Sequence, residues 1–267
     1  MRHWTEFSVE IPLPVALPSG ELEPMESLMF RGLADRDDAL YDQVNHPRAM
    51  TNVLTASLIG INGRIRKIDA VLARKIFLRM DIPVRHYVFD ELLLGSDPDG
   101  DVRDEIRCAN QMCRKILEVA PIVRTAVPLK ANASEAERKA SAWLIESQLE
   151  LELKHPVYFP LSGKDDIEIA TLIIGHGNGE HHELAADILR DQGADAAMRA
   201  LRVKRIIRTV PEVPLITSDI VGQLSKPDQK RWQQWDAKNS IVRTIQDARC
   251  PDCGMLTSYA KNRAAFF

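Results

Sequence analysis

Cys250-Pro251-Asp252-Cys253-Gly254, close to the end of a 267-residue chain, is the stretch that decides the predicted fold. Two cysteines three positions apart, with proline between them and glycine after them, form a tight turn in which both thiolates can bind one zinc ion. Such a knuckle supplies two ligands, and a closed tetrahedral site needs four. The only other cysteines are Cys108 and Cys113, which have a C-x4-C spacing. The sequence therefore predicts one structural zinc site made of Cys108, Cys113, Cys250 and Cys253. The alternative is that Cys108 and Cys113 are ordinary reduced cysteines without a metal.

The two cysteine pairs also indicate an internal repeat. Cys250 follows Cys108 by 142 positions (108 to 250), and Gly163 follows Gly20, another predicted turn glycine, by 143 (20 to 163). We therefore expect an α+β fold of two tandem repeats, each a β-hairpin followed by helices and a terminal cysteine knuckle. The first repeat would span residues 1–130, a bridging helix 131–148 and the second repeat 149–267. The alternative is coincidence, because hairpins and cysteine pairs are common.

Local patterns place strands and helices within this scheme. Residues 149–153 alternate strictly between leucine and glutamate, which is typical of a half-buried strand, and 167–174 would form the returning strand. Residues 7–15 and 22–30 would form the corresponding hairpin of the first half. Helices are expected over 183–191, 195–208 and 217–224, and from 227 to about 246. Trp232 and Trp235 would share a face of the last helix and pack in the core, with a protein interface as the alternative.

Composition excludes several classes of function. The chain is 45% hydrophobic and 27% charged with a formal net charge of −3, so no overall positive field attracts nucleic acid or anionic membranes. No apolar run approaches the roughly 20 residues of a membrane span, and the first six residues lack the apolar core of a signal peptide. We expect a cytoplasmic protein with reduced cysteines and no small-molecule substrate, nucleic acid or membrane as partner.

A second candidate for metal chemistry is the run from His176 to Glu183. Its imidazoles, from His176, His181 and His182, and its carboxylates can bind a catalytic metal. The spacing differs from a helical HExxH site, and His181 and His182 would diverge on a helix because adjacent residues do not share a face. Phosphate-binding loops, dinucleotide fingerprints and nucleophile elbows are also missing. We expect a solvated glycine-rich loop leading into a helix, with a metal-dependent enzyme as the alternative function.

The order of these motifs resembles a known family. A hairpin with Leu17-Pro18-Ser19-Gly20 precedes Ile68-Asp69, Arg79-Met80-Asp81 and a cysteine pair; a second hairpin with Phe159-Pro160-Leu161-Ser162-Gly163 precedes the final Cys-Pro-Asp-Cys-Gly. This order is similar to the baseplate hub assembly chaperones of T-even-like contractile phage tails and related contractile injection systems. The resemblance implies a non-enzymatic assembly or structural protein that binds other tail or baseplate proteins, either in the cytoplasm or incorporated into a phage-like particle. A zinc-ribbon adaptor subunit of a nucleic-acid complex is a further alternative.

Overall fold

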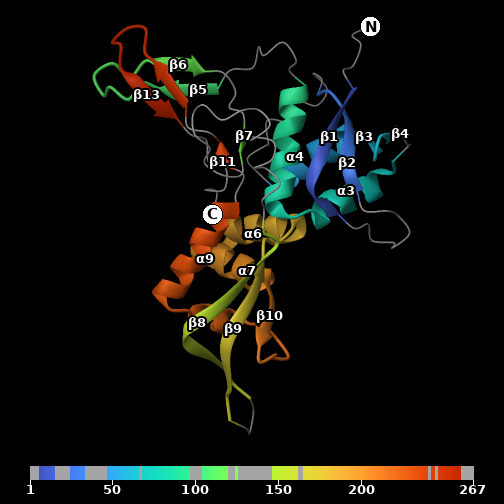
Figure 1. The fold of residues 1–267 in the computed structure, drawn as a ribbon, viewed down its shortest axis with the longest axis vertical. Helices are drawn as coiled ribbons and strands as arrows, with labels where there is room; N and C mark the ends of the chain where they lie inside the picture. The colour runs from blue at the N-terminus through green and yellow to red at the C-terminus, as the bar shows by residue number, and fades with distance from the viewer. Residues whose placement is uncertain are drawn as a thin grey trace.

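The computed structural model describes residues 6–15, 25–33, 47–65, 68–96, 104–119, 124–125, 146–161, 165–239, 242–243 and 246–259. Helices and small antiparallel sheets alternate along the chain, which confirms the α+β class. Figure 1 shows two lobes that meet at α6 and a separate cluster of short strands that contains β5, β6 and β13. Within the described part, every helix is too short or too polar to cross a membrane.

The first lobe is a four-stranded antiparallel sheet covered by helices. Its elements are β1 (Glu6–Val15), β2 (Met25–Arg31), α2 (Pro47–Ser57), β3 (Leu58–Ile61), β4 (Arg64–Ile65), α3 (Ala70–Arg79) and α4 (Ile82–Gly95). The strand order is β1-β2-β3-β4. Asn62 and Gly63 both have positive φ, at 50° and 70°, so they form the tight turn that joins β3 to β4. Phe30, Phe77 and Phe89 lie fully buried in the apolar core between sheet and helices.

The second lobe is a three-stranded antiparallel sheet in the order β10-β9-β8. Its elements are β8 (Gln148–Phe159), β9 (Ile167–Gly175), α6 (Gly179–Gln192), α7 (Ala194–Arg205), β10 (Ile206–Val210), α8 (Ser218–Gly222) and α9 (Lys226–Asn239). The glutamates of the alternating run face solvent while Leu151 is buried. Trp232 and Trp235 are buried in the core of this lobe, as the sequence predicts.

A third unit, which we call the cysteine module, takes one hairpin from each half of the chain. Its strands are β5 (Asp104–Arg107) paired with β6 (Ile116–Val119), and β12 (Gln246–Arg249) paired with β13 (Leu256–Tyr259). Next to them in sequence, β7 (Arg124–Thr125) pairs with β11 (Val242–Arg243), so the two halves also share a short antiparallel ladder. Cys108, Leu117 and Cys250 form the small buried core of the module.

The lobes contact each other where α6 begins. The chain before α6 pairs with the α3–α4 connection: Ile82 N donates to Gly177 O at 3.0 Å, and Gly179 N donates to Met80 O at 3.2 Å. A Cβ placed on Gly179 would lie 2.5 Å from Phe77 O, so the backbones approach as closely as only glycine allows. The two lobes are therefore joined by main-chain contacts as well as by the cysteine module.

Two predicted helices end earlier than expected. The helix predicted over 195–208 ends at Arg205, because the β-branched segment Ile206–Val210 pairs with β9. The helix predicted to reach about 246 ends at Asn239, and strands β11 and β12 follow. The strand β8 begins at Gln148, the last residue of the predicted bridging helix. The turn glycines Gly20 and Gly163 and residues 131–145 lie outside the described residues, and the domain boundaries stay predictions.

Candidate metal centre

The four predicted cysteines lie at the tips of the two hairpins of the cysteine module. Cys108 directly follows β5 and Cys250 directly follows β12. In each hairpin the N–H of the first cysteine closes the turn: Cys108 N donates to Lys115 O at 2.8 Å, and Cys250 N donates to Met255 O at 2.9 Å. The first turn is therefore two residues longer than the second, as the C-x4-C and C-x2-C spacings require.

The two turns have the same backbone conformation after the second cysteine. Arg114 follows Cys113 with φ of 49°, and Gly254 follows Cys253 with φ of 72°. Both residues are therefore in the left-handed region, which glycine adopts readily and arginine only at a cost. The longer turn thus keeps the geometry of a zinc knuckle without the glycine that marks one in the sequence.

The sulfur atoms are arranged as a metal ion would need them. Cys108 Sγ lies 3.5 Å from Cys253 Sγ, and Cys113 Sγ lies 3.8 Å from Cys250 Sγ. All four sulfurs lie within 4.8 Å of one another. Zinc–thiolate bonds of about 2.3 Å in a regular tetrahedron place neighbouring sulfurs about 3.8 Å apart. The structure therefore brings the four residues together with spacings compatible with a metal site such as zinc.

Contacts between the hairpins hold this arrangement from both sides. Ala109 N donates to Thr257 Oγ1 at 3.0 Å, which links the first knuckle to β13. Lys115 Nζ lies 2.6 Å from Asp252 Oδ1, an exposed ion pair that links the two knuckles. Cys108 and Cys250 are buried, Cys113 is half-buried and Cys253 is exposed. One side of the sulfur cluster therefore faces the protein and the other faces solvent.

Backbone N–H groups near the sulfurs shift their pKa values in different directions. A hydrogen bond from Met255 N–H, supported by the neighbouring sulfurs, lowers the pKa of Cys253 to about 7. Lys115 N–H likewise favours the thiolate of Cys113, but burial and the adjacent sulfurs outweigh it and raise that pKa to about 11. Burial raises the pKa of Cys108. Cys253 is thus the most acidic of these three thiols, and a bound metal ion would deprotonate the others.

The donor set fits a metal that prefers thiolate ligands, such as zinc. Four thiolates in a tetrahedron suit Zn²⁺ or an iron–sulfur centre, whereas harder cations prefer oxygen ligands. In three of the cysteines a backbone N–H two residues further along donates to the sulfur, from Asn110, Lys115 and Met255. Such outer hydrogen bonds orient the ligands and compensate the charge of the thiolates.

The histidines of the run from His176 to Glu183 have other partners. His176 stacks on Trp235 at 4.5 Å between ring centroids, and its Nε2 lies 2.6 Å from Glu146 O. His181 closes the start of α6, since its N–H donates to Asn178 Oδ1 and its Nδ1 accepts from Asn178 N. His182 packs beside His86. Within the described residues, the only group of three or more close metal ligands is the four cysteines.

The sequence predicts a solvated loop for the run from His176 to Glu183, but part of this run is buried. The run does lead into a helix, α6, but His176, His182 and Glu183 are buried. The segment is buried by tertiary packing, because it lies where the two lobes meet. Local sequence contains no signal for that contact.

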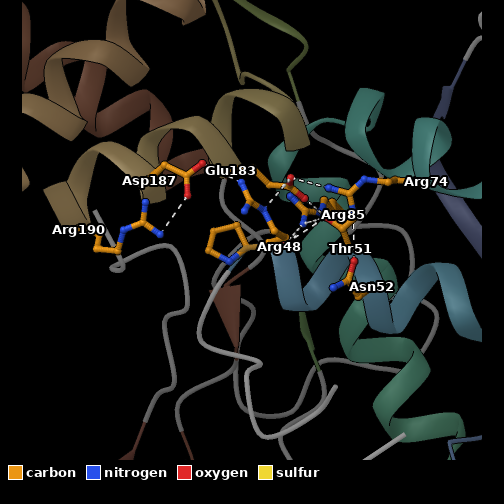
Figure 2. A network of polar contacts seen from close by, with 9 residues as sticks. Arg48, Thr51, Asn52, Arg74, Arg85, Glu183, Asp187 and Arg190 are labelled. Carbon is orange, nitrogen blue, oxygen red and sulfur yellow. Dashed lines mark hydrogen bonds and ion pairs between the residues drawn. The ribbon is translucent and has the colours of Figure 1, made fainter. Parts of the chain in front are cut away.

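Glu183 belongs to a polar cluster that sequence reasoning missed. Figure 2 shows Glu183 of α6 pointing at residues of the first lobe. Its Oε1 accepts from Thr51 Oγ1 at 2.6 Å, and its Oε2 lies 2.8 Å from Arg74 Nη2. Arg48 lies 3.7 Å from the same oxygen and 2.7 Å from Asp187. The cluster therefore ties α6 to α2 and α3 by charge.

Arg85 is the cation at the centre of this cluster. Its side chain is fully buried, and its Nη2 donates to Thr51 Oγ1 and Pro47 O. Its Nε and Nη1 have no hydrogen-bond acceptor among the described residues. Burial lowers the pKa of Arg85 to about 10, and the charge of Glu183 opposes that shift. Arg85 thus depends on a carboxylate that comes from the other lobe.

Comparison with family models, with characterised proteins and with solved structures finds no match for this chain.

Proposed function

We propose that the protein is a non-enzymatic structural or assembly protein whose two halves are clasped by one zinc ion bound to Cys108, Cys113, Cys250 and Cys253. The observation that carries this proposal is the meeting of four sulfurs, two from each half, within 4.8 Å. Two of these ligands are separated by 145 positions in the chain. A metal at this place acts on the whole architecture, because it joins hairpins from different halves of the chain.

Structural zinc contributes on the order of 10 kcal/mol to folding in small domains, since the site exists only in the folded chain. Among the described residues, the buried core of the cysteine module is Cys108, Leu117 and Cys250, with Ile106, Cys113 and Ala248 packed against it. So small an apolar core cannot by itself offset the chain entropy of ordering two hairpins. Zinc binding supplies the missing stabilisation.

Native mass spectrometry combined with metal analysis tests the clasp. We expect one zinc per chain, and we expect the Cys253→Ser variant to lose it. His181→Ala is the matched control, because His181 lies in the other candidate cluster and should leave zinc content unchanged. Zinc retained in Cys253→Ser and lost in His181→Ala would refute the clasp and favour the metal-dependent enzyme.

We also propose that the two halves arose by duplication of one hairpin-and-helix unit ending in a cysteine knuckle. Both halves contain a hairpin whose second strand pairs with a third, β2 with β3 and β9 with β10. Both knuckle hairpins have four-residue strands, and Arg107 and Arg249 take the same place before the first cysteine. These likenesses support a common origin.

A knuckle exchange tests the duplication. The segment 108–114 is replaced by the sequence Cys-Pro-Asp-Cys-Gly of the second knuckle. If the two turns are equivalent, the chimera keeps β5 paired with β6 and binds one zinc. Loss of zinc with the second knuckle intact would contradict the equivalence.

The assembly role that we propose is in the baseplate of a contractile tail or injection system, with other tail or baseplate proteins as partners and the cytoplasm as the place of assembly. The support is the motif order of the two hairpins and the Cys-Pro-Asp-Cys-Gly knuckle. Copurification of the tagged protein with baseplate components of its own host system tests this role. Recovery of the protein without any of them, with one zinc bound, would retain the clasp and remove the baseplate role.

A further inference from the structure

Two sulfur pairs of the cysteine module have a common pattern. Each pair takes one sulfur from each half of the chain: Cys108 with Cys253 at 3.5 Å, and Cys113 with Cys250 at 3.8 Å. Each pair also combines different exposures, because Cys253 is exposed and Cys113 half-buried while their partners are buried. An oxidant from solvent can therefore reach one member of each pair, and a second sulfur lies next to it inside the module.

We propose that these four cysteines form a peroxide-oxidation site, in which Cys253 and Cys113 react with peroxide and Cys108 and Cys250 resolve them into two disulfides between the halves. The inference rests on the proposed zinc clasp and gives the same clasp a second, covalent state. Hydrogen peroxide is the oxidant class that the chemistry requires.

The first disulfide forms in two balanced steps. The thiolate of Cys253 attacks one oxygen of hydrogen peroxide, the O–O bond breaks, Cys253 becomes a sulfenic acid, and the released hydroxide takes a proton to form water. The sulfur of Cys108 then attacks the sulfur of Cys253; the S–S bond forms, the S–OH bond breaks, and this hydroxide leaves as a second water after taking a proton. One peroxide thus accepts two electrons from two thiolates.

The second pair repeats this chemistry with a second peroxide. A zinc ion bound to the four thiolates leaves as Zn²⁺, because the thiolate is the zinc ligand and it has been consumed. Since both disulfides link β5–β6 to β12–β13, oxidation exchanges a metal link for covalent links. The halves therefore stay joined after zinc has left, which disulfides within each knuckle would not achieve.

Peptide mapping of the peroxide-treated full-length protein tests the pairing. Trypsin cleaves after Arg107, Arg114, Arg249 and Lys261, so one peptide carries Cys108 with Cys113 and another carries Cys250 with Cys253. We expect the two peptides joined to each other to exceed the two internally looped peptides at least tenfold. A majority of looped peptides, or of sulfinic and sulfonic acids, would overturn the proposal.

Double variants with two remaining cysteines provide a matched comparison. Cys108→Ser with Cys253→Ser leaves Cys113 and Cys250, a proposed pair with its sulfurs 3.8 Å apart, whereas Cys108→Ser with Cys250→Ser leaves Cys113 and Cys253, which the proposal does not pair. Both variants have lost the four-thiolate site, and the second keeps both peroxide-reacting cysteines without a resolving one. We expect the proposed pair to cross-link at least fivefold faster under peroxide, and equal rates would contradict the assigned pairs. If either variant fails to fold, the map of the unaltered chain still decides.

Zinc release separates this inference from the proposal on which it rests. We expect one zinc released for each chain whose peptides become linked, measured with a colorimetric zinc chelator. A chain that contains no zinc before peroxide would refute the zinc clasp, while its disulfide map would still test the oxidation site. A zinc-bound chain that yields looped peptides would refute the oxidation site alone.

Discussion

Replacing Glu183 with alanine should separate the energetic contribution of the lobe contact from that of the cysteine module. The Glu183 side chain is only 10% exposed and lies against Arg74 at 2.8 Å and Thr51 at 2.6 Å. It is also the carboxylate that opposes the burial-induced fall in the Arg85 pKa. Its removal takes away the carboxylate charge that offsets the burial of Arg85.

The expected loss follows from that geometry. Removing one member of a buried ion pair costs about 3–5 kcal/mol, because the remaining charge stays desolvated. Arg74 is 36% exposed and recovers some hydration, so we expect the lower end, about 3 kcal/mol. Glu183→Gln keeps the shape and an acceptor for Thr51, and we expect a smaller loss of about 2 kcal/mol.

Urea unfolding followed by circular dichroism measures these losses. With a slope of about 3 kcal/mol/M, the alanine variant should unfold at a midpoint about 1 M lower than the parent. Glu180→Ala is the matched control, because Glu180 lies three residues earlier on α6 and is exposed; its change should stay within about 0.5 kcal/mol. A loss below about 1 kcal/mol in Glu183→Ala, or an equal loss in Glu180→Ala, would refute the reasoning.

Three other substitutions test single features. Burial raises the pKa of Asp81 from 3.8 to about 6, so the carboxylate form destabilises the fold as pH rises through that range. Asp81→Asn should therefore raise the unfolding free energy by about 1–3 kcal/mol at pH 7.5 and leave it unchanged below pH 4. An equal difference at both pH values would contradict this. Gly254→Ala places a side chain at φ of 72° in open space, and should cost about 1 kcal/mol in thermal unfolding while zinc content stays at one; a cost near zero would remove the conformational argument. Gly179→Ala pushes a Cβ against the backbone of α3 and should lower the unfolding free energy, measured in urea, by about 1–3 kcal/mol. Gly222 has open space around it, so Gly222→Ala is the control and should lower the unfolding free energy by less than half of that amount.

The knuckle and the alternating strand could be predicted from the sequence because their signals are local. Cys250 to Gly254 determines its own turn, and the leucine–glutamate alternation over 149–153 determines which face of β8 is buried. The proximity of the two cysteine pairs was predicted because a closed tetrahedral site needs four ligands and Cys108 and Cys113 are the only other cysteines. That inference used the ligand count of the whole chain, which is information that local propensity lacks.

The lobe contact could not be predicted because its partners are far apart in sequence. Glu183 and Thr51 are separated by 132 positions, and the sequence around either residue does not indicate the other as its partner. The same reason explains β10, because the β-branched run 206–210 follows α7 without a proline and becomes a strand only when β9 is beside it. The conformation of Arg114 could not be predicted for a different reason: this residue has the positive φ of a knuckle turn at a position where the sequence has no glycine.

The separation of the cysteine pairs has a consequence for how the chain is made. Cys108 leaves the ribosome 145 residues before Cys253, which at about 5–20 residues per second is a wait of roughly 7–30 s. During that interval the first hairpin holds two thiols whose partners have not yet been translated. Only a product translated through the second knuckle can bring the four sulfurs together, so a chain that ends before Cys250 keeps an unmatched pair of sulfurs.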